Sequence, residues 1–189
     1  MIVGLVILGI VVLLLLWGVA IYNGLVRLRA LVKEGFSGIN VQLRRRADLI
    51  PNLVSTVEGY ATHEREVLTQ VTAARTAAVQ AGSVAATAQA DMAMTGMLGR
   101  LMAVAEAYPQ LKANENFQQL QGELTEIEDN LQSARRYYNA TVRDLNTKIQ
   151  SFPNVLFARP MGFTEEEFYT DTDASIQTAP VVKFGAAKA

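Results

Sequence analysis

The sequence predicts an all-α protein with a single N-terminal transmembrane helix that continues into an antiparallel helical bundle and is followed by a mostly irregular C-terminal tail. The first 26 residues contain 21 apolar residues and no charged side chain. Beyond them, apolar residues recur in steps of three and four, which is typical of amphipathic helices. We therefore expect a membrane anchor over residues 1–24, a helical bundle over 25–152 and a C-terminal extension with one short helix over 153–189.

Residues 2–21 form an uninterrupted apolar run in which 15 of the 20 residues are Leu, Ile or Val. As a helix this run is about 30 Å long, the thickness of a bilayer's hydrocarbon core. A cleaved signal peptide is the competing interpretation, but the basic leading region and the small-residue cleavage site that it needs are both missing. The sequence therefore predicts an uncleaved membrane anchor, whose residues include Ile2, Leu5, Leu8, Val12, Leu15, Trp17 and Ile21.

Basic residues follow the apolar run closely, while Glu34 is the single acidic residue among them. They are Arg27, Arg29, Lys33, Arg44, Arg45 and Arg46. By the positive-inside rule, this asymmetry places the short N-terminus outside and the domain in the cytoplasm. Arg27, Arg29 and Lys33 are nearest to the bilayer, so they are the expected contacts with membrane lipid.

Two apolar stripes predict that the anchor runs directly into the first helix of the bundle. The first stripe comprises Leu25, Leu28, Val32, Phe36, Ile39 and Leu43, and the second comprises Ile50, Val54, Val57, Ala61, Leu68 and Val71. Between them, Asp48 could cap a new helix with Pro51 in its first turn. Alternatively, Pro51 could kink one long helix. Asp48–Pro51 is therefore either a turn or a kink.

The remaining helices are predicted from turn residues and from the heptad pattern. Gly82 and Ser83 mark a helix end and a turn, and the next helix is expected over 92–108, ending before Pro109. Asn114 or Asn116 is expected to cap the last helix, which Pro153 ends. Its heptad seam comprises Phe117, Leu124, Leu131, Tyr138, Leu145 and Phe152, with Leu120, Ile127 and Ala134 between them.

The tail after Pro153 carries weaker signals. Residues 153–163 are apolar and irregular, so we expect them to pack on the bundle, on a membrane or on a neighbour. The sequence Thr164–Glu167 resembles a capping box and predicts one short turn of helix. Residues 181–184 (VVKF) could form a short strand if a partner edge exists.

Three separated blocks of sequence resemble the LemA family. They are YNGLVRLRALVKEGFSGINVQLRRRADLIPNLVSTVEGYATHERE over 22–66, AEAYPQLKANENFQQLQGEL over 105–124, and RRYYNATVRDLNTKIQSFPN over 135–154. With the anchor, the resemblance covers most of residues 1–169. It implies a single-pass protein of the bacterial inner membrane with a helical cytoplasmic domain and no assigned catalytic activity. Some members of that family are associated with specialised membrane compartments and others with membrane proteases.

Composition leaves little chemistry for an enzyme. The chain has no cysteine, one histidine and a formal net charge of −1, which disfavours thiolate or zinc sites and a globally basic nucleic-acid binder. His63-Glu64 begins like a zinc-protease motif, but the second histidine that the motif needs does not exist. We therefore expect no catalytic residue, no metal site, no cofactor and no nucleic-acid partner.

Several polar and small residues are candidates for an interface. We expect Arg44, Arg45 and Arg46 to pair with acidic residues of the last helix or of a neighbouring copy, since they lie about 35 Å along the helix from the membrane. The acidic candidates are Glu123, Glu126, Glu128 and Asp129. Tyr138, Asn139 and Asn146 lie in or near the heptad seam, where polar residues can set register and partner number. Ala20 and Gly24 offer a small-residue contact between anchors.

Two functions follow from these features. The first is a non-enzymatic membrane scaffold that self-associates into a homo-oligomer. The alternative is an adaptor or regulator that presents a helical docking surface to another membrane protein, such as a protease. A stable complex with a different protein would favour the adaptor, and a defined assembly of copies would favour the scaffold.

Overall fold

The computed structural model describes residues 2–61 and 63–170, and six helices are found within these ranges. They are α1 (Ile2–Glu58), α2 (Arg65–Gln80), α3 (Val84–Ala107), α4 (Pro109–Lys112), α5 (Glu115–Gln150) and α6 (Val155–Ala158). No strand occurs in the described part of the chain. The expected strand at 181–184 lies outside the described residues. The all-α fold with one long apolar N-terminal helix is therefore confirmed.

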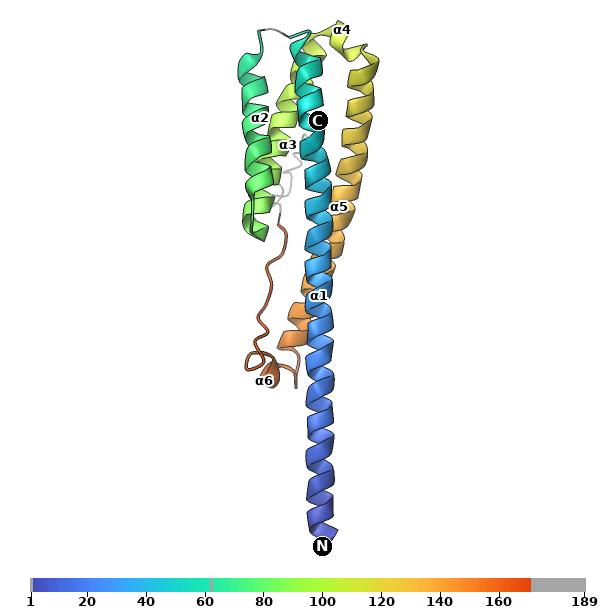
Figure 1. The fold of residues 1–189 in the computed structure, drawn as a ribbon, viewed down its shortest axis with the longest axis vertical. Helices are drawn as coiled ribbons and strands as arrows, with labels where there is room; N and C mark the ends of the chain where they lie inside the picture. The colour runs from blue at the N-terminus through green and yellow to red at the C-terminus, as the bar shows by residue number, and fades with distance from the viewer. Residues whose placement is uncertain (1, 62, 171–189) are drawn as a thin grey trace, which may run out of the picture.

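The helices form an antiparallel bundle around α1, which runs the full length of the molecule (Figure 1). Helix α5 returns beside α1, while α2 and α3 cover only the half of the bundle away from the N-terminus. Helix α6 lies low on the bundle, beside α1. From there an extended segment of residues 163–170, which we call the strap, runs back along the bundle.

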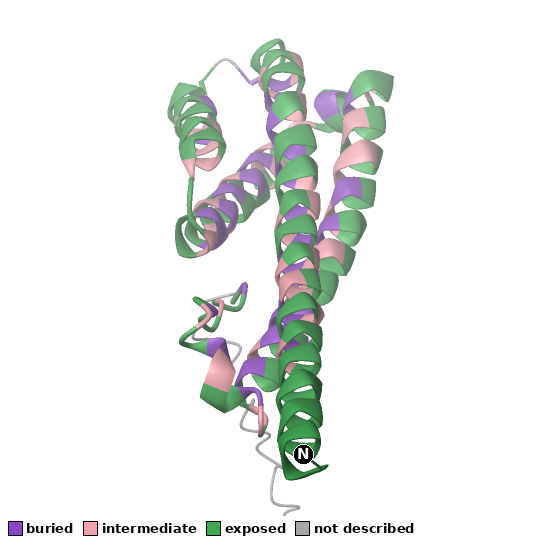
Figure 2. Ribbon diagram, turned by 60° about the horizontal axis from the view of Figure 1, so that its bottom comes forward, coloured by how far each residue is buried: buried purple, intermediate pink, exposed green. Residues whose placement is uncertain are grey.

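The apolar N-terminal part of α1 stands clear of the bundle, and Figure 2 shows it as a continuous exposed surface. Buried residues begin at Ile21 and then follow one face of α1 to Val57. This is the face that the two apolar stripes predict. The start of the buried stripe at Ile21 thus divides one continuous helix into an exposed N-terminal part and a part packed in the bundle.

Pro51 lies inside α1, so Asp48–Pro51 is not a turn. A proline has no N–H to donate to the carbonyl four residues earlier, which here belongs to Ala47. Arg75 of α2 replaces that donor, because its Nε donates to the Ala47 oxygen at 2.8 Å. A side chain 24 residues further along the chain therefore keeps the proline-containing turn of α1 bonded.

The chain turns instead between α1 and α2, at residues 59–61 and 63–64, where the sequence pattern predicts no break. The amides of Tyr60 and Ala61 both donate to the Val57 carbonyl, at 3.0 and 2.8 Å, and close the end of α1. The apolar spacing continues across this turn because Ala61 and Leu68 are both buried in the same core. Periodicity alone does not distinguish one helix from two that share a core.

Helices α3 and α5 each begin directly after a polar residue that caps them. The Ser83 hydroxyl accepts from the amide of Ala86, and the Asn114 side chain accepts from the amide of Phe117. The predicted cap at Asn114 is confirmed, and the turn expected at Gly82 and Ser83 also supplies a cap for α3. Helix α3 begins at Val84, eight residues before the expected start, and its first turns are rich in alanine.

Two expectations for the C-terminal part are wrong. Phe152 does not join the heptad seam: α5 ends at Gln150, and Phe152 is 81% exposed. Residues 164–167 are extended rather than helical, and the short helix lies at Val155–Ala158. The side chain of Thr164 does not cap a helix, because the segment after it bonds to α5 instead.

Candidate functional site

The first candidate site is the bare end of α1. Among the described residues α1 is the one helix that is long and apolar enough to cross a membrane, with a mean hydropathy of 3.1 over its most apolar 18-residue window and no residue of that window buried. Ile2, Leu5, Leu8, Val12, Leu15 and Trp17 are exposed, and Ile21 is buried against the bundle. The surface that would face lipid therefore gives way to packed core near Ile21.

The basic residues beyond this end differ in their surroundings. Arg27 and Lys33 are exposed, whereas Arg29 is half-buried, with its guanidinium carbon 4.7 Å from the centre of the Phe163 ring. Ala20 is exposed, and a Cβ at Gly24 would meet nothing within 4 Å. The predicted lipid contacts of the basic residues and the anchor contact at Ala20 and Gly24 stay predictions.

The three consecutive arginines separate. Arg44 and Arg45 are exposed, and Arg46 is buried. The Arg46 Nη1 lies 3.1 Å from the Asp91 Oδ1 and 3.3 Å from the Glu128 Oε2. It also donates to the Thr95 hydroxyl at 3.1 Å. Glu128 was one of the acidic partners expected on the last helix, while Asp91 lies on α3.

Arg46 belongs to a larger group that we call the mid-bundle charge cluster: Arg46, Asp91, Glu128, Arg135 and the Tyr169 hydroxyl. Arg135 pairs with Asp91 and also lies 3.8 Å from the Glu128 Oε1. The Tyr169 hydroxyl donates to the Asp91 Oδ2 at 2.7 Å. The cluster joins α1, α3, α5 and the strap, and its two carboxylates balance its two guanidinium groups.

Asp91 is the centre of this cluster, and its side chain is 1% exposed. Burying a carboxylate is costly unless charge and hydrogen bonds compensate it, and here two arginines and a tyrosine do so. Burial, followed by the charge of Asp91, raises the pKa of Tyr169 above its ordinary value. The hydroxyl is therefore held as a donor to Asp91. The arrangement is suited to holding three helices and the strap together.

A second set of polar side chains binds the strap to α5. The Asn139 Nδ2 donates to the Tyr169 carbonyl at 2.9 Å, and the Tyr169 amide donates back to the Asn139 Oδ1 at 2.8 Å. Asn146 makes the same reciprocal pair with Glu166, both at 2.9 Å. Because the asparagines are seven residues apart, two helical turns of α5 present equivalent amides to the strap.

Tyr138 adds a third bond to the strap, because its hydroxyl donates to the Glu167 carbonyl at 2.8 Å. Burial, and then the charges of Glu166 and Glu167, raises the pKa of Tyr138 to about 12. The sequence analysis places Tyr138, Asn139 and Asn146 at a possible interface between copies. In the structure their polar groups bind within the chain, and a role between copies stays a prediction.

Sequence reasoning missed Asp91, Tyr169 and Gly35. A Cβ at Gly35 would lie 3.1 Å from the Tyr138 Cα, so α1 and α5 approach closely at this point. Asp91 falls in an otherwise apolar and alanine-rich helix, and this isolated acid on the buried face of α3 was the available signal. Nothing in the local sequence around Tyr169 indicates its partner 78 residues away.

The described residues contain no group of three His, Asp or Glu side chains that could hold a metal ion. His63 lies exposed in the turn between α1 and α2. A groove between α3 and α5 is lined by apolar Leu98, Met102 and Leu124, with Arg46 and Glu128 at one end. Arg46 and Glu128 already belong to the mid-bundle charge cluster, and Asp129 is the third charged residue that lines the groove.

The LemA family model matches residues 35–184 of the chain. Among curated proteins, the magnetosome proteins MamQ 1 and MamQ 2 of Paramagnetospirillum magneticum are each 26% identical over 179 residues, covering 81% of this chain. The magnetosome protein MamQ of Magnetospirillum gryphiswaldense is 25% identical over the same length and coverage. The chain spans 66% of the length of each of these relatives. This similarity and the apolar end of α1 together indicate a membrane-associated protein.

Proposed function

This chain belongs to the LemA family, and on that premise we propose that it is a non-enzymatic, single-pass scaffold that self-associates into a homo-oligomer at the bacterial inner membrane. Its N-terminus lies outside, and its helical domain lies in the cytoplasm. The observation that carries the proposal is the continuity of α1. One helix provides both the bare apolar end and the central packing element of the bundle, so the domain is rigidly coupled to its anchor.

The direction of the anchor is supported by the distribution of charge. Exposed Arg27 and Lys33 follow the apolar run directly, and no charged residue precedes them. A cysteine in a short polar tag before Met1, or one at exposed Ser133, gives a unique reactive thiol, because the chain has no cysteine. In intact spheroplasts, a membrane-impermeant maleimide should label the cysteine of the tag and should not label Ser133→Cys. The opposite labelling would reverse the orientation.

Self-association is tested by the mass of the full-length protein in lipid nanodiscs or mild detergent at micromolar concentration. A defined assembly of several copies is the expected result, and a monodisperse monomer would overturn the proposal. Gly24→Leu is the informative variant, since a side chain at Gly24 has room within the chain. It should reduce the mass if anchors meet at Ala20 and Gly24, whereas Gly9→Leu, which also has room, should leave it unchanged.

The adaptor function is the second candidate. It is favoured by the groove between α3 and α5, whose apolar lining at Leu98, Met102 and Leu124 lies in the half of the bundle away from the anchor. Crosslinking in cells through a photoreactive residue at Met102 separates the two functions. Recovery of a single different membrane protein would support the adaptor, and recovery of self-crosslinks alone would count against it.

A further inference from the structure

We propose that the corner between α5 and α6 is a second membrane-binding site, in which acyl chains of the leaflet around Trp17 cover its exposed apolar side chains. The corner comprises Phe152, Val155 and Leu156, which are 81%, 42% and 60% exposed. The inference rests on the proposed anchoring of α1 and adds a lipid contact made by the bundle itself. The domain would then be held at two points rather than hung from one helix.

The level of the corner along α1 is set by an aromatic contact. The rings of Trp17 and Phe157 meet edge to face, with centroids 5.8 Å apart. Trp17 lies four residues before Ile21, so it is about 6 Å inside the end of the apolar run. Interfacial segments bury their apolar face about 5–10 Å into the headgroup and acyl boundary. Helix α6 therefore reaches the depth that such segments occupy.

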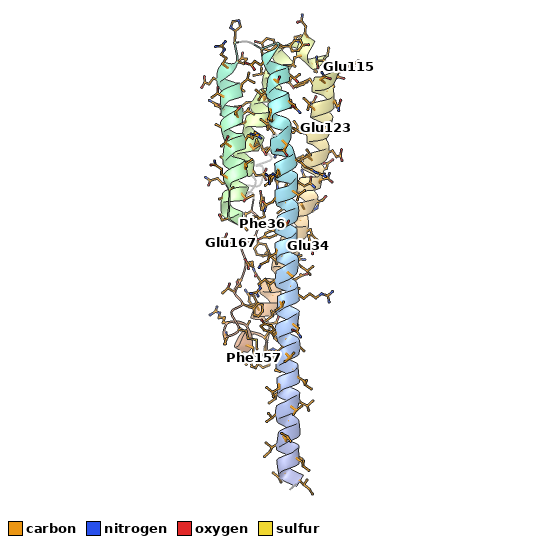
Figure 3. The ribbon with its side chains drawn as sticks, viewed as in Figure 1. Glu34, Phe36, Glu115, Glu123, Phe157 and Glu167 are labelled. Atoms are coloured by element: carbon orange, nitrogen blue, oxygen red, sulfur yellow. The ribbon has the colours of Figure 1, made fainter. Side chains whose placement is uncertain are left out.

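A second contact keeps the segment after α6 at the same end of α1. The ring centroids of Tyr22 and Phe163 lie 5.6 Å apart, and the Arg29 guanidinium carbon lies over the Phe163 ring, 4.7 Å from its centroid. Figure 3 shows Phe157 beside α1, directly above its bare apolar part. The aromatic rings and the adjacent cation are typical of a membrane–water boundary.

The distribution of exposed apolar residues favours lipid as the occupant. Elsewhere on the described bundle, large exposed apolar residues stand singly, at Val41, Tyr60, Val79, Tyr137 and Phe168. At the corner three of them fall within five residues, beside the lipid-facing surface of α1. Arg159, directly after α6, is exposed and supplies a positive charge at the same end of the bundle, which suits anionic headgroups.

The experiment uses the full-length protein with one nitroxide label, reconstituted into vesicles of phosphatidylethanolamine and phosphatidylglycerol. Leu156→Cys carries the label at the corner. Val79→Cys is the matched control, since Val79 is an aliphatic residue 54% exposed and lies beside Asn40 of α1, about 29 Å beyond Ile21 along the helix. We expect the Leu156 label to be relaxed severalfold more by oxygen than by a water-soluble nickel chelate, and the Val79 label to show the reverse.

Two outcomes would contradict lipid binding at the corner without contradicting the membrane anchor. A Leu156 label as open to the nickel chelate as the Val79 label would place the corner in water. A label shielded from both reagents would place it under protein. Quenching of Trp17 by brominated acyl chains in the unlabelled chain tests the anchor separately. If Trp17 is not quenched, α1 is not a membrane anchor, and the proposed lipid contact at the corner is contradicted as well. A label at Phe152→Cys repeats the measurement at the most exposed corner residue.

Discussion

The two halves of the bundle bury their apolar side chains with different structural elements. The distal half has α1, α2, α3, α5 and the short α4 around a core that includes Ile50, Leu53, Leu101 and Phe117. The half nearer the N-terminus, which we call the proximal half, has α1, α5 and the short α6. Its buried core includes residues of the strap and only Ala88 from the first turns of α3. The two cores are distinct, and the mid-bundle charge cluster lies between the residues that form them. Where α2 and most of α3 are absent, the strap completes the core.

The difference teaches that an extended segment can complete a helical core if its backbone groups find partners. Extended chain buried against a helix leaves amides and carbonyls that the helix backbone cannot bond. Asn139, Asn146 and Tyr138 supply those bonds from α5, while Phe163 and Tyr169 are buried in the proximal core. In the distal half the helices bond most of their own backbone, and side chains complete the bonding at capped helix starts and at the Ala47 carbonyl, which Arg75 bonds.

The largest effect is expected where the two halves meet. Asp91→Ala removes the carboxylate that Arg46, Arg135 and the Tyr169 hydroxyl share, and it should lower the free energy of unfolding by about 3–5 kcal/mol. Denaturant unfolding of the detergent-solubilised full chain, followed by circular dichroism, measures it. Asp129→Ala, on the exposed face of α5, is the control. Equal losses in the two variants would contradict the central role of Asp91.

The strap of the proximal half can be released selectively. Asn139→Ala removes two hydrogen bonds to the backbone of Tyr169, which should cost about 2 kcal/mol. Since 1.4 kcal/mol is a factor of ten, amide hydrogen exchange across 163–170 should accelerate at least about tenfold, while α2 and α3 are unaffected. Asn130→Ala, at an exposed position, should leave strap exchange unchanged. Unchanged exchange in Asn139→Ala would show that side-chain clamping does not hold the strap.

The close approach of α1 and α5 in the proximal half is tested by two glycines on one helix. Alanine is favoured over glycine in a helix by about 0.5–1 kcal/mol, so Gly38→Ala, with open space around it, should stabilise the protein. Gly35→Ala places its Cβ 3.1 Å from the Tyr138 Cα, and overpacking of this kind costs about 1–3 kcal/mol. Thermal unfolding should therefore rank Gly35→Ala below Gly38→Ala. The reverse order would mean that the helices separate without cost.

The smallest effect concerns the distal half and the proline in α1. Arg75→Met removes the donor to the Ala47 carbonyl and should cost about 1 kcal/mol. In a Pro51→Ala background the restored amide bonds that carbonyl within the helix, so the same substitution should cost close to nothing. Urea unfolding of the unmodified protein, the two single variants and the double variant measures the coupling free energy between Arg75 and Pro51. An equal cost in both backgrounds would assign the effect of Arg75 to something other than the proline.

Much of the helical architecture could be predicted from local sequence, because periodicity and caps are local properties. The apolar run, the stripe from Leu25 to Leu43 and the caps at Ser83 and Asn114 each depend on neighbours within a few residues. The turn between α1 and α2 could not be predicted from periodicity, because the residues on both sides of it face one core. Phe152 continues the heptad spacing but lies beyond the end of α5, where the spacing no longer describes a helix face.

The candidate sites divide in the same way. The bare apolar end and the basic residues after it are visible in the order of residues along the chain, since a bilayer selects for the length of a single segment. The mid-bundle charge cluster, the clamped strap and the corner beside Trp17 join residues far apart in the sequence, such as Asp91 with Tyr169 and Trp17 with Phe157. Such contacts depend on which helix faces which, and that arrangement is set by packing of the whole chain rather than by any local pattern.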